Sequence, residues 1–419
     1  MHSSRKIKQG IVITFLLLQS VLYSQKTKNL YDTFSIFGTI RDSESNAVIA
    51  NADLYLLNCN KSVVANSEGN FQFNISKSSF NDKLIISALG YFSDTVMVSE
   101  LEKLQNKSLH IKLKKEANVE VSLNEMVVAS SKKKSKSLSA TTILKKAKEN
   151  IENNYYQKPF NQKFFFRAQT IKDSIFTINE EASINTYSPN GIKVSDDAAA
   201  NYFGEILQLR KKVNSETIEN WKGIGYFGIV IFRNIMLSNQ NLLYQTKDFE
   251  LKKEGTTTYG GKNVYVISFT NLNPTVFTSG FGNPAPKSAI GFIYVETDSF
   301  AIVKFEQYVV LKRERSNDND DIVIESSLKI TQTYKNVNGR YFINYCNEKI
   351  ESNYFSMLSK TQISIVNSNY DLMSEDIGTE NILAIKRPID RLKLDVKVIE
   401  DLEYWNNNNF IIENKKMEF

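Results

Sequence analysis

Four short runs between residues 36 and 91 decide the fold of the first part of this chain: Phe37-Gly38-Thr39-Ile40-Arg41-Asp42, Ala52-Asp53-Leu54-Tyr55-Leu56, Ser67-Glu68-Gly69-Asn70-Phe71-Gln72-Phe73 and Leu84-Ile85-Ile86-Ser87-Ala88-Leu89-Gly90-Tyr91. Phe71, Phe73 and Ile75 alternate with polar residues, which is typical of a strand with one face on a core and one in water. Residues 66–70 have the composition of a hairpin turn, and Gly69 can take the positive φ that such a turn needs. The runs predict a small β-sandwich.

Together the four runs resemble the carboxypeptidase-regulatory-like domain, a transthyretin-like module common at the N-terminus of exported proteins of Gram-negative bacteria. The resemblance implies a seven-stranded β-sandwich, which we place at residues 34–115. It implies no activity, because the module is a fold that precedes many unrelated domains.

The first 24 residues have the composition of a secretory signal. Residues 5–8 include three basic side chains, residues 11–18 are apolar, and residues 22–24 form the predicted cleavage site. The apolar run is too short to span a bilayer. The first cysteine, Cys59, lies far from the cleavage site, which argues against a lipoprotein anchor. We therefore expect an exported protein, located in the periplasm or at the outer-membrane periphery of a Gram-negative bacterium, with residues 25–33 as a short N-terminal segment.

The composition is that of an ordinary globular protein, with 42% hydrophobic and 11% aromatic residues. The 419 residues are enough for two or three domains. Loss of the signal lowers the formal charge from +6 to about +3, which is too mild to indicate binding of nucleic acid. Cys59 and Cys346 leave two alternatives, a disulfide between the two parts of the chain or two buried thiols.

A linker is predicted at residues 116–140. Within it, Leu123-Asn124-Glu125-Met126-Val127-Val128 resembles the short strand that follows this sandwich in exported proteins, including TonB-dependent receptors. Residues 130–137 are rich in Ser and Lys, which is typical of a solvated linker, and contact of the lysines with anionic lipid headgroups is the alternative. Too few residues follow for a receptor barrel. Because residues 130–137 have no apolar face, we expect the sandwich to fold alone and to move as a unit. The alternative is that the apolar residues 126–128 add a strand to a sheet edge and stiffen the joint.

Residues 141–419 are predicted to form one helix followed mainly by strands. Thr141 or Thr142 is expected to cap a helix that ends near Asn154. Strands are predicted at residues 163–171, 249–254, 263–270, 290–296, 300–311, 322–334, 340–350 and 360–367. Their spacing favours an antiparallel meander, so the fold class is mainly β with helices: the sandwich, then a larger curved antiparallel sheet or half-barrel.

Two further helical segments are predicted to cover this sheet. Residues 198–213 place Tyr202, Ile206 and Leu209 on one helical face, and residues 229–243 are mainly apolar. The hairpins at residues 261–267 and 291–303 resemble the central hairpins of the outer-membrane lipoprotein carrier half-barrel.

Most catalytic sites are excluded by the scarcity of histidine. His2 is lost with the signal, so only His110 remains, whereas the zinc carboxypeptidases that give the sandwich its name need two histidines and a glutamate. Alternation places His110 on the solvated face of a strand. Glu180-Glu181, on a stretch expected to be helical, and Asp196-Asp197 are candidate acid and base pairs, but adjacent side chains do not face each other. No phosphate loop, dinucleotide fingerprint or complete calcium loop is present in the sequence, so no cofactor or metal site is predicted.

Three functions stay open. The first is a non-enzymatic envelope protein that binds an apolar or amphipathic ligand, such as a lipid, or a partner protein. The alternatives are a structural docking accessory of an outer-membrane assembly and, less favoured, a hydrolase that uses carboxylates alone. A half-barrel leaves an apolar inner face that is filled by its own helices or by a guest. The residues predicted to line it are Phe164, Phe166, Val264, Val266, Ile293, Val295, Val303, Phe305, Tyr341, Trp221 and Phe232.

Overall fold

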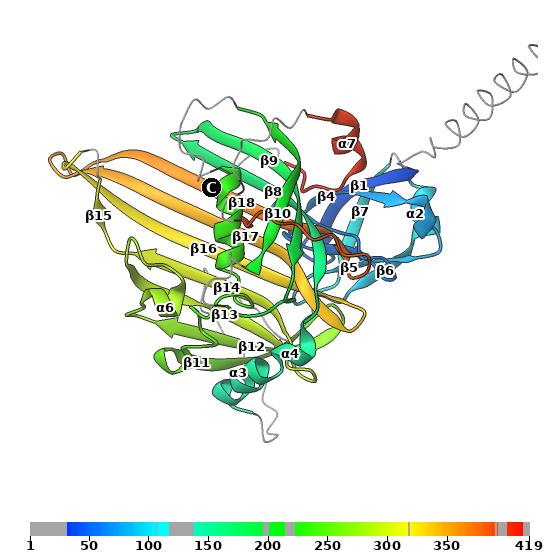
Figure 1. The fold of residues 1–419 in the computed structure, drawn as a ribbon, viewed down its shortest axis with the longest axis horizontal. Helices are drawn as coiled ribbons and strands as arrows, with labels where there is room; N and C mark the ends of the chain where they lie inside the picture. Colours follow the sequence, from blue (N-terminus) through cyan, green and yellow to red (C-terminus); the bar gives the residue numbers. More distant parts are fainter. Residues whose placement is uncertain are drawn as a thin grey trace, which may run out of the picture.

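The computed structural model describes residues 32–105, 107–116, 138–195, 201–213, 223–316, 319–389, 392 and 400–413. Its fold is mainly β, as predicted, with a small sandwich followed by one large antiparallel sheet. Figure 1 shows the sandwich, in blue, packed beside the large sheet, whose strands run from cyan-green to orange. The predicted signal, most of the linker and its short strand lie outside the described residues.

The sandwich has the predicted strands. One sheet has the order β4-β1-β7 and the other β3-β2-β5-β6. Their bounds are β1 Thr33–Asp42, β2 Asp53–Leu56, β3 Ser62–Val64, β4 Asn70–Ser76, β5 Lys83–Ser87, β6 Asp94–Met97 and β7 Ser108–Leu113, with short helices η1 Lys77–Ser79 and α2 Val98–Glu102. Ile36, Phe73 and Ile86 are fully buried between the sheets. Gly38 is required for close strand approach, because a Cβ there would lie 2.1 Å from the carbonyl oxygen of Leu109 on β7.

The large sheet has 11 strands in the order β10-β9-β8-β18-β17-β16-β14-β13-β12-β11, with β15 paired to β16. It is open, so β10 and β11 are its two edges. The bounds are β8 Phe160–Lys172, β9 Ile175–Ser188, β10 Phe203–Lys211, β11 Glu250–Tyr259, β12 Lys262–Asn271, β13 Pro286–Glu296, β14 Ile302–Leu311, β15 Glu314–Arg315, β16 Ile322–Val337, β17 Arg340–Ser356 and β18 Gln362–Gly378.

The structure corrects the helix predicted at residues 198–213. The described part of that segment forms the edge strand β10, paired antiparallel to β9. The register of this pair shifts between Ile206 and Gln208, which marks a β-bulge. With this extra residue, Ile206 and Leu209 lie on the same side of the strand although they are three positions apart in the sequence. Residues on one face of a helix have the same spacing, which explains the helix prediction. A helix is also predicted around Glu180 and Glu181, but these residues lie in strand β9.

The helix predicted from Thr141 or Thr142 is present but begins slightly earlier. Its N-cap is Ser139, whose Oγ accepts a hydrogen bond of 3.2 Å from the backbone N–H of Thr142. The helix is interrupted at Asn150, giving α3 Ala140–Glu149 and α4 Ile151–Asn154.

A segment at residues 223–249, here called the cover segment, packs on one face of the large sheet, the inner face. It contains η3 Ile224–Tyr226, α5 Phe227–Phe232 and η4 Thr246–Asp248, so only the start of the helix predicted at residues 229–243 is helical. In Figure 1 this segment, in green, crosses in front of β17 and β18, and α5 contacts both strands. A further short helix, α6 Val276–Ser279, contacts β13.

The opposite, outer face of the sheet carries the sandwich and residues 400–413, here called the C-terminal segment, which includes α7 Leu402–Asn407. The core of the sandwich is continuous with Phe165, Tyr345 and Met373 of the sheet and with Trp405 and Ile411 of the C-terminal segment. The prediction of an independently moving sandwich is therefore wrong. It rests on the polar linker alone, whereas the sandwich packs against apolar residues of β8, β17 and β18.

Candidate functional site

Most of the residues predicted to line an inner cavity come together on the inner face. Val264 and Val266 are the exceptions, because they are directly opposite Glu296 and Tyr294 of β13 and so lie on the outer face. The nine from the strands belong to one hydrophobic core, and Phe232 packs against it half-buried. Trp221 lies outside the described residues. The partners of these side chains include the cover segment, since Phe227 lies 6.1 Å from Phe164 and 5.5 Å from Phe166 between ring centroids. The inner face is thus packed with the protein's own side chains, and its opening for a ligand stays a prediction.

One charged pair is buried beneath the cover segment. Arg233, at the end of α5, donates a hydrogen bond of 2.8 Å to Oε2 of Glu348 on β17. Tyr226 donates to the same oxygen at 3.1 Å and stacks on Tyr370 with a centroid distance of 3.8 Å. The other carboxylate oxygen, Oε1, is buried without a hydrogen-bond partner among the described residues. Such a half-satisfied carboxylate is costly to bury, which marks this point as a candidate polar anchor within an apolar face.

Glu180 and Glu181 do not form an acid–base pair, because they point to opposite faces of β9. Glu180, on the inner face, accepts from the backbone N–H of Ile224 at 3.0 Å and pairs with Lys211 at 2.9 Å. It therefore fixes the start of the cover segment. A Cβ at Gly223 would lie 2.2 Å from its Oε2, so a larger residue there would displace the Glu180 carboxylate.

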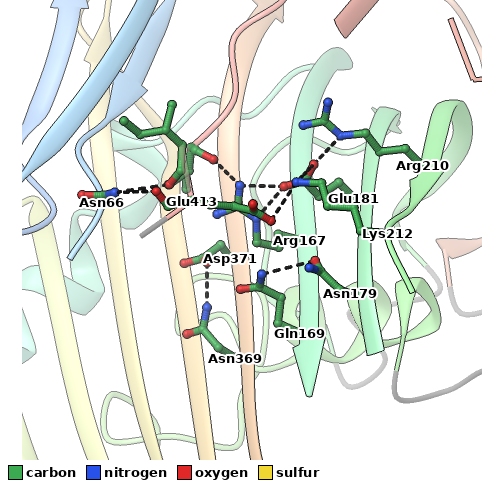
Figure 2. Close-up of polar contacts among 12 residues, drawn as sticks. Asn66, Arg167, Gln169, Asn179, Glu181, Arg210, Lys212, Asn369, Asp371 and Glu413 are labelled. Carbon is green, nitrogen blue, oxygen red and sulfur yellow. Dashed lines mark hydrogen bonds and ion pairs between the residues drawn. The ribbon is translucent and has the colours of Figure 1, made fainter. Parts of the chain in front are cut away.

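Glu181 is the centre of a charged cluster on the outer face, shown in Figure 2. Its fully buried carboxylate pairs with Arg167 at 2.6 Å, with Arg210, and with Lys212 at 3.3 Å. Burial alone would raise the pKa of Glu181, but the Arg167, Lys212 and Arg210 cations outweigh it and hold the pKa below its usual value. Arg167 is also directly opposite Asp371 of β18 in the strand register. The cluster is a structural network, since every carboxylate in it has partners.

This cluster also holds the C-terminal segment. Arg167 donates to the carbonyl oxygen of Ile411, and Lys212 pairs with Glu413 at 2.7 Å (Figure 2). On the sandwich side, the amide of Asn74 donates to the carbonyl of Asn408 at 2.9 Å. The C-terminal segment therefore bonds to both units and lies across their joint.

A second polar centre lies where the sandwich meets the ends of the sheet strands. Asp53 of β2 accepts hydrogen bonds from the hydroxyl of Tyr259 and, at 2.6 Å, from the amide of Asn344. Burial raises the pKa of Asp53 to about 6, and burial lowers the pKa of nearby Lys335 to about 8. Lys335 donates at 2.7 Å to the hydroxyl of Ser62 on β3. Sequence reasoning missed this centre because its bonded partners are 206 to 291 residues apart in sequence.

The remaining candidates are accounted for individually. His110 is exposed, and its Nδ1 lies 3.2 Å from the hydroxyl of Thr39. Both cysteines are free thiols. Among the described residues, no group of three or more His, Cys, Asp or Glu side chains is arranged to hold a metal ion. In the same part of the chain, no helix is long and apolar enough to cross a membrane. Asp196 and Asp197 lie outside the described residues.

Comparison with known proteins supports the N-terminal assignment. Residues 36–128 match the family model of the CarboxypepD_reg-like domain, which confirms the resemblance inferred from the four opening runs. The match covers less than half of the chain, so it identifies this domain and leaves the larger unit unassigned. No curated protein matches the chain.

Solved structures offer a weaker likeness. A LolA superfamily protein from Nitrosomonas europaea is 12% identical, with a TM-score of 0.23, over 59% of this chain and 96% of that one. A DUF1329 family protein from Desulfovibrio piger is 9% identical, with the same TM-score and coverage. A protein of unknown function from Bacteroides fragilis, named as membrane-associated, is 11% identical, with a TM-score of 0.15, over 83% of this chain and 99% of that one. TM-scores this low carry no argument about the fold or the residue roles of this chain.

Proposed function

We propose that this protein is a non-enzymatic binding protein of the Gram-negative cell envelope, exported by its first 24 residues, and that its ligand is apolar or amphipathic. The observation that carries the proposal is the covering of the inner face. An open sheet buries a large aromatic and aliphatic surface beneath short helices and turns rather than beneath a second sheet.

Short helices are weakly stable on their own, because each makes few internal hydrogen bonds and relies on packing. The cover segment is therefore the part of this core that separates from the sheet at least cost. In the proposed bound state, the apolar part of a ligand replaces Phe227 against Phe164 and Phe166. A polar end of the ligand meets Arg233, which lies at the end of α5 beside Tyr226 and Glu348.

The test is to enlarge this space and look for a guest. Phe227→Ala removes a ring from the inner core, and we expect the folded variant to bind a dansylated fatty acid more tightly than the natural protein does. Phe71→Ala is the matched control, because it removes an equally buried ring from the sandwich core. Native mass spectrometry of the natural protein, purified from an expressing Gram-negative host, should in addition find a copurified lipid.

No copurified lipid, together with equal fatty-acid binding by both folded variants, would contradict the proposal. Copurification of a defined envelope protein with an empty interior would instead favour the docking accessory.

A further inference from the structure

A cleft of about 340 Å³ lies between the sandwich and the outer face of the large sheet, separate from the inner core. Residues 48–51, with Ala88, Leu89 and Tyr91, form its sandwich wall. The sheet wall consists of side chains of β13, β14 and β16, including Lys304 and Lys329. Small-molecule sites have volumes of roughly 300–1,000 Å³, so the cleft is large enough for a ligand.

The single carboxylate that lines the cleft is already paired. Glu306 pairs with Lys304 at 3.0 Å and accepts a hydrogen bond of 3.0 Å from the hydroxyl of Tyr294. Burial alone would raise the pKa of Glu306, but the Lys304 cation outweighs it and keeps the carboxyl ionised. Glu306 is therefore occupied by Lys304 and Tyr294, and the two lysines of the cleft leave it with a net positive charge.

Lys329 is the cleft lysine that forms no direct ion pair, because Glu306, the nearby acid, pairs with Lys304. Lys329 is directly opposite Lys349 in the β16–β17 register, on the same outer face. Neither lysine forms an ion pair or hydrogen bond with any residue that the structure describes, and Glu351, the next acid on that face of β17, accepts from Asn353. Partial burial lowers the pKa of Lys329. The charge of Glu306 opposes this shift, whereas the charges of Lys349 and Lys304 add to it. Like charges directly opposite in a sheet are destabilising, so an anion placed between them would be stabilised.

The opposite wall limits what else the ligand carries. Residues 48–51, Ala88 and Leu89 contribute no charge, while on the sheet wall the Thr331 and Thr333 hydroxyls can hydrogen-bond a polar group. We propose that this cleft binds an oxyanion, a phosphate or carboxylate group, attached to a neutral or apolar body. The anion lies at Lys329 and the body lies against the sandwich, which makes the sandwich part of a binding site and not only a spacer.

The test is calorimetric titration of the full chain with inorganic phosphate, octyl phosphate and octanol at low ionic strength. Octyl phosphate is expected to bind in the cleft. Octanol, which lacks the anion, is not expected to bind there. Lys329→Gln should weaken phosphate binding about tenfold, the size expected for one charge-assisted hydrogen bond, and Lys329→Arg should retain most of it. Tighter binding of octyl phosphate than of inorganic phosphate assigns the site to a lipid-like headgroup, whereas equal binding assigns it to the free anion.

Lys312→Gln is the matched control, because Lys312 is exposed and lies outside the cleft. An equal loss of phosphate binding in Lys312→Gln and Lys329→Gln would overturn the proposal, since it would show a general effect of net charge. Unchanged binding by a folded Lys329→Gln would overturn it as well. Thermal melts of both variants establish that each is folded.

Discussion

The inner and outer faces of the large sheet are buried in different ways. The inner face is aromatic and aliphatic, and the cover segment fills it with side chains of the same kind. The outer face carries charged and amide side chains in rows across the strands, and the sandwich and C-terminal segment cover part of it. Phe165 and Phe166 show the contrast within two residues, because each is fully buried but in a different core.

The difference shows which contacts are specific. Apart from charged contacts such as the Arg233–Glu348 pair, the inner face is apolar and its packing depends on matching volume, so it can in principle accept another apolar guest. On the outer face, a buried charge is tolerated only with its partners in place, as at Glu181 and Arg167. The outer face therefore fixes how the sandwich docks, and the inner face is the one that can exchange its contents.

The largest expected effects come from the adjacent phenylalanines. Phe166→Ala and Phe165→Ala should each lower the free energy of unfolding by about 4 kcal/mol, because each leaves a cavity in a packed core. Only Phe165→Ala should also increase hydrogen exchange in β3 of the sandwich, since Phe165 belongs to the shared core. Denaturant unfolding and native-state exchange measure the two effects, and equal exchange of β3 in both variants would break the distinction between the faces.

The charged cluster should give the next largest effect. Glu181→Ala leaves Arg167 buried without its partner, and we expect a loss of about 3 kcal/mol in the free energy of unfolding. Glu325→Ala is the control, because its partner Arg313 is exposed and such pairs contribute below about 1 kcal/mol. Similar losses in urea melts of the two variants would mean that the cluster adds nothing beyond an ordinary surface pair.

The joint between the two units should respond to pH through Asp53. Its folded pKa of about 6 is above the unfolded value near 3.8, so the folded state binds the proton more tightly and stability falls as pH rises from 4 through 6. Asp53→Asn removes this dependence. Between pH 4 and pH 7, its stability relative to the natural protein should therefore rise by about 2 kcal/mol. Parallel pH profiles of unfolding free energy for the two proteins would contradict the burial of an ionisable Asp53.

The smallest expected effect concerns the lysines of the outer face. Lys349→Gln removes the charge opposite Lys329 and should raise the free energy of unfolding by about 0.5 kcal/mol at low salt. The gain should disappear at high salt, because these side chains are exposed and screened. A loss of stability in thermal melts would show that Lys349 has a favourable contact that outweighs the repulsion.

Part of this architecture could be predicted from sequence because its signals are local. The alternation at Phe71 and Phe73 and the turn at Gly69 predict the sandwich, and long alternating runs predict most strands of the large sheet. Strand β10 was missed because a bulge at Ile206 disrupts the period of two. The pairs Arg167–Glu181 and Asp53–Asn344 could not be predicted, since each depends on which strands become neighbours. Most of the predicted lining residues of the inner face do gather, but sequence alone does not show what fills the space between them.

The C-terminal segment has a mechanical consequence. Asn409 and Asn74 bond to each other although 335 residues separate them, and the whole large sheet lies within the loop that they close. A force applied between the sandwich and residues 400–413 would act first on this short junction. Forced unfolding should therefore begin with release of the C-terminal segment from Asn74 of the sandwich and from Arg167 of the sheet, before the strands β8 to β18 separate from one another.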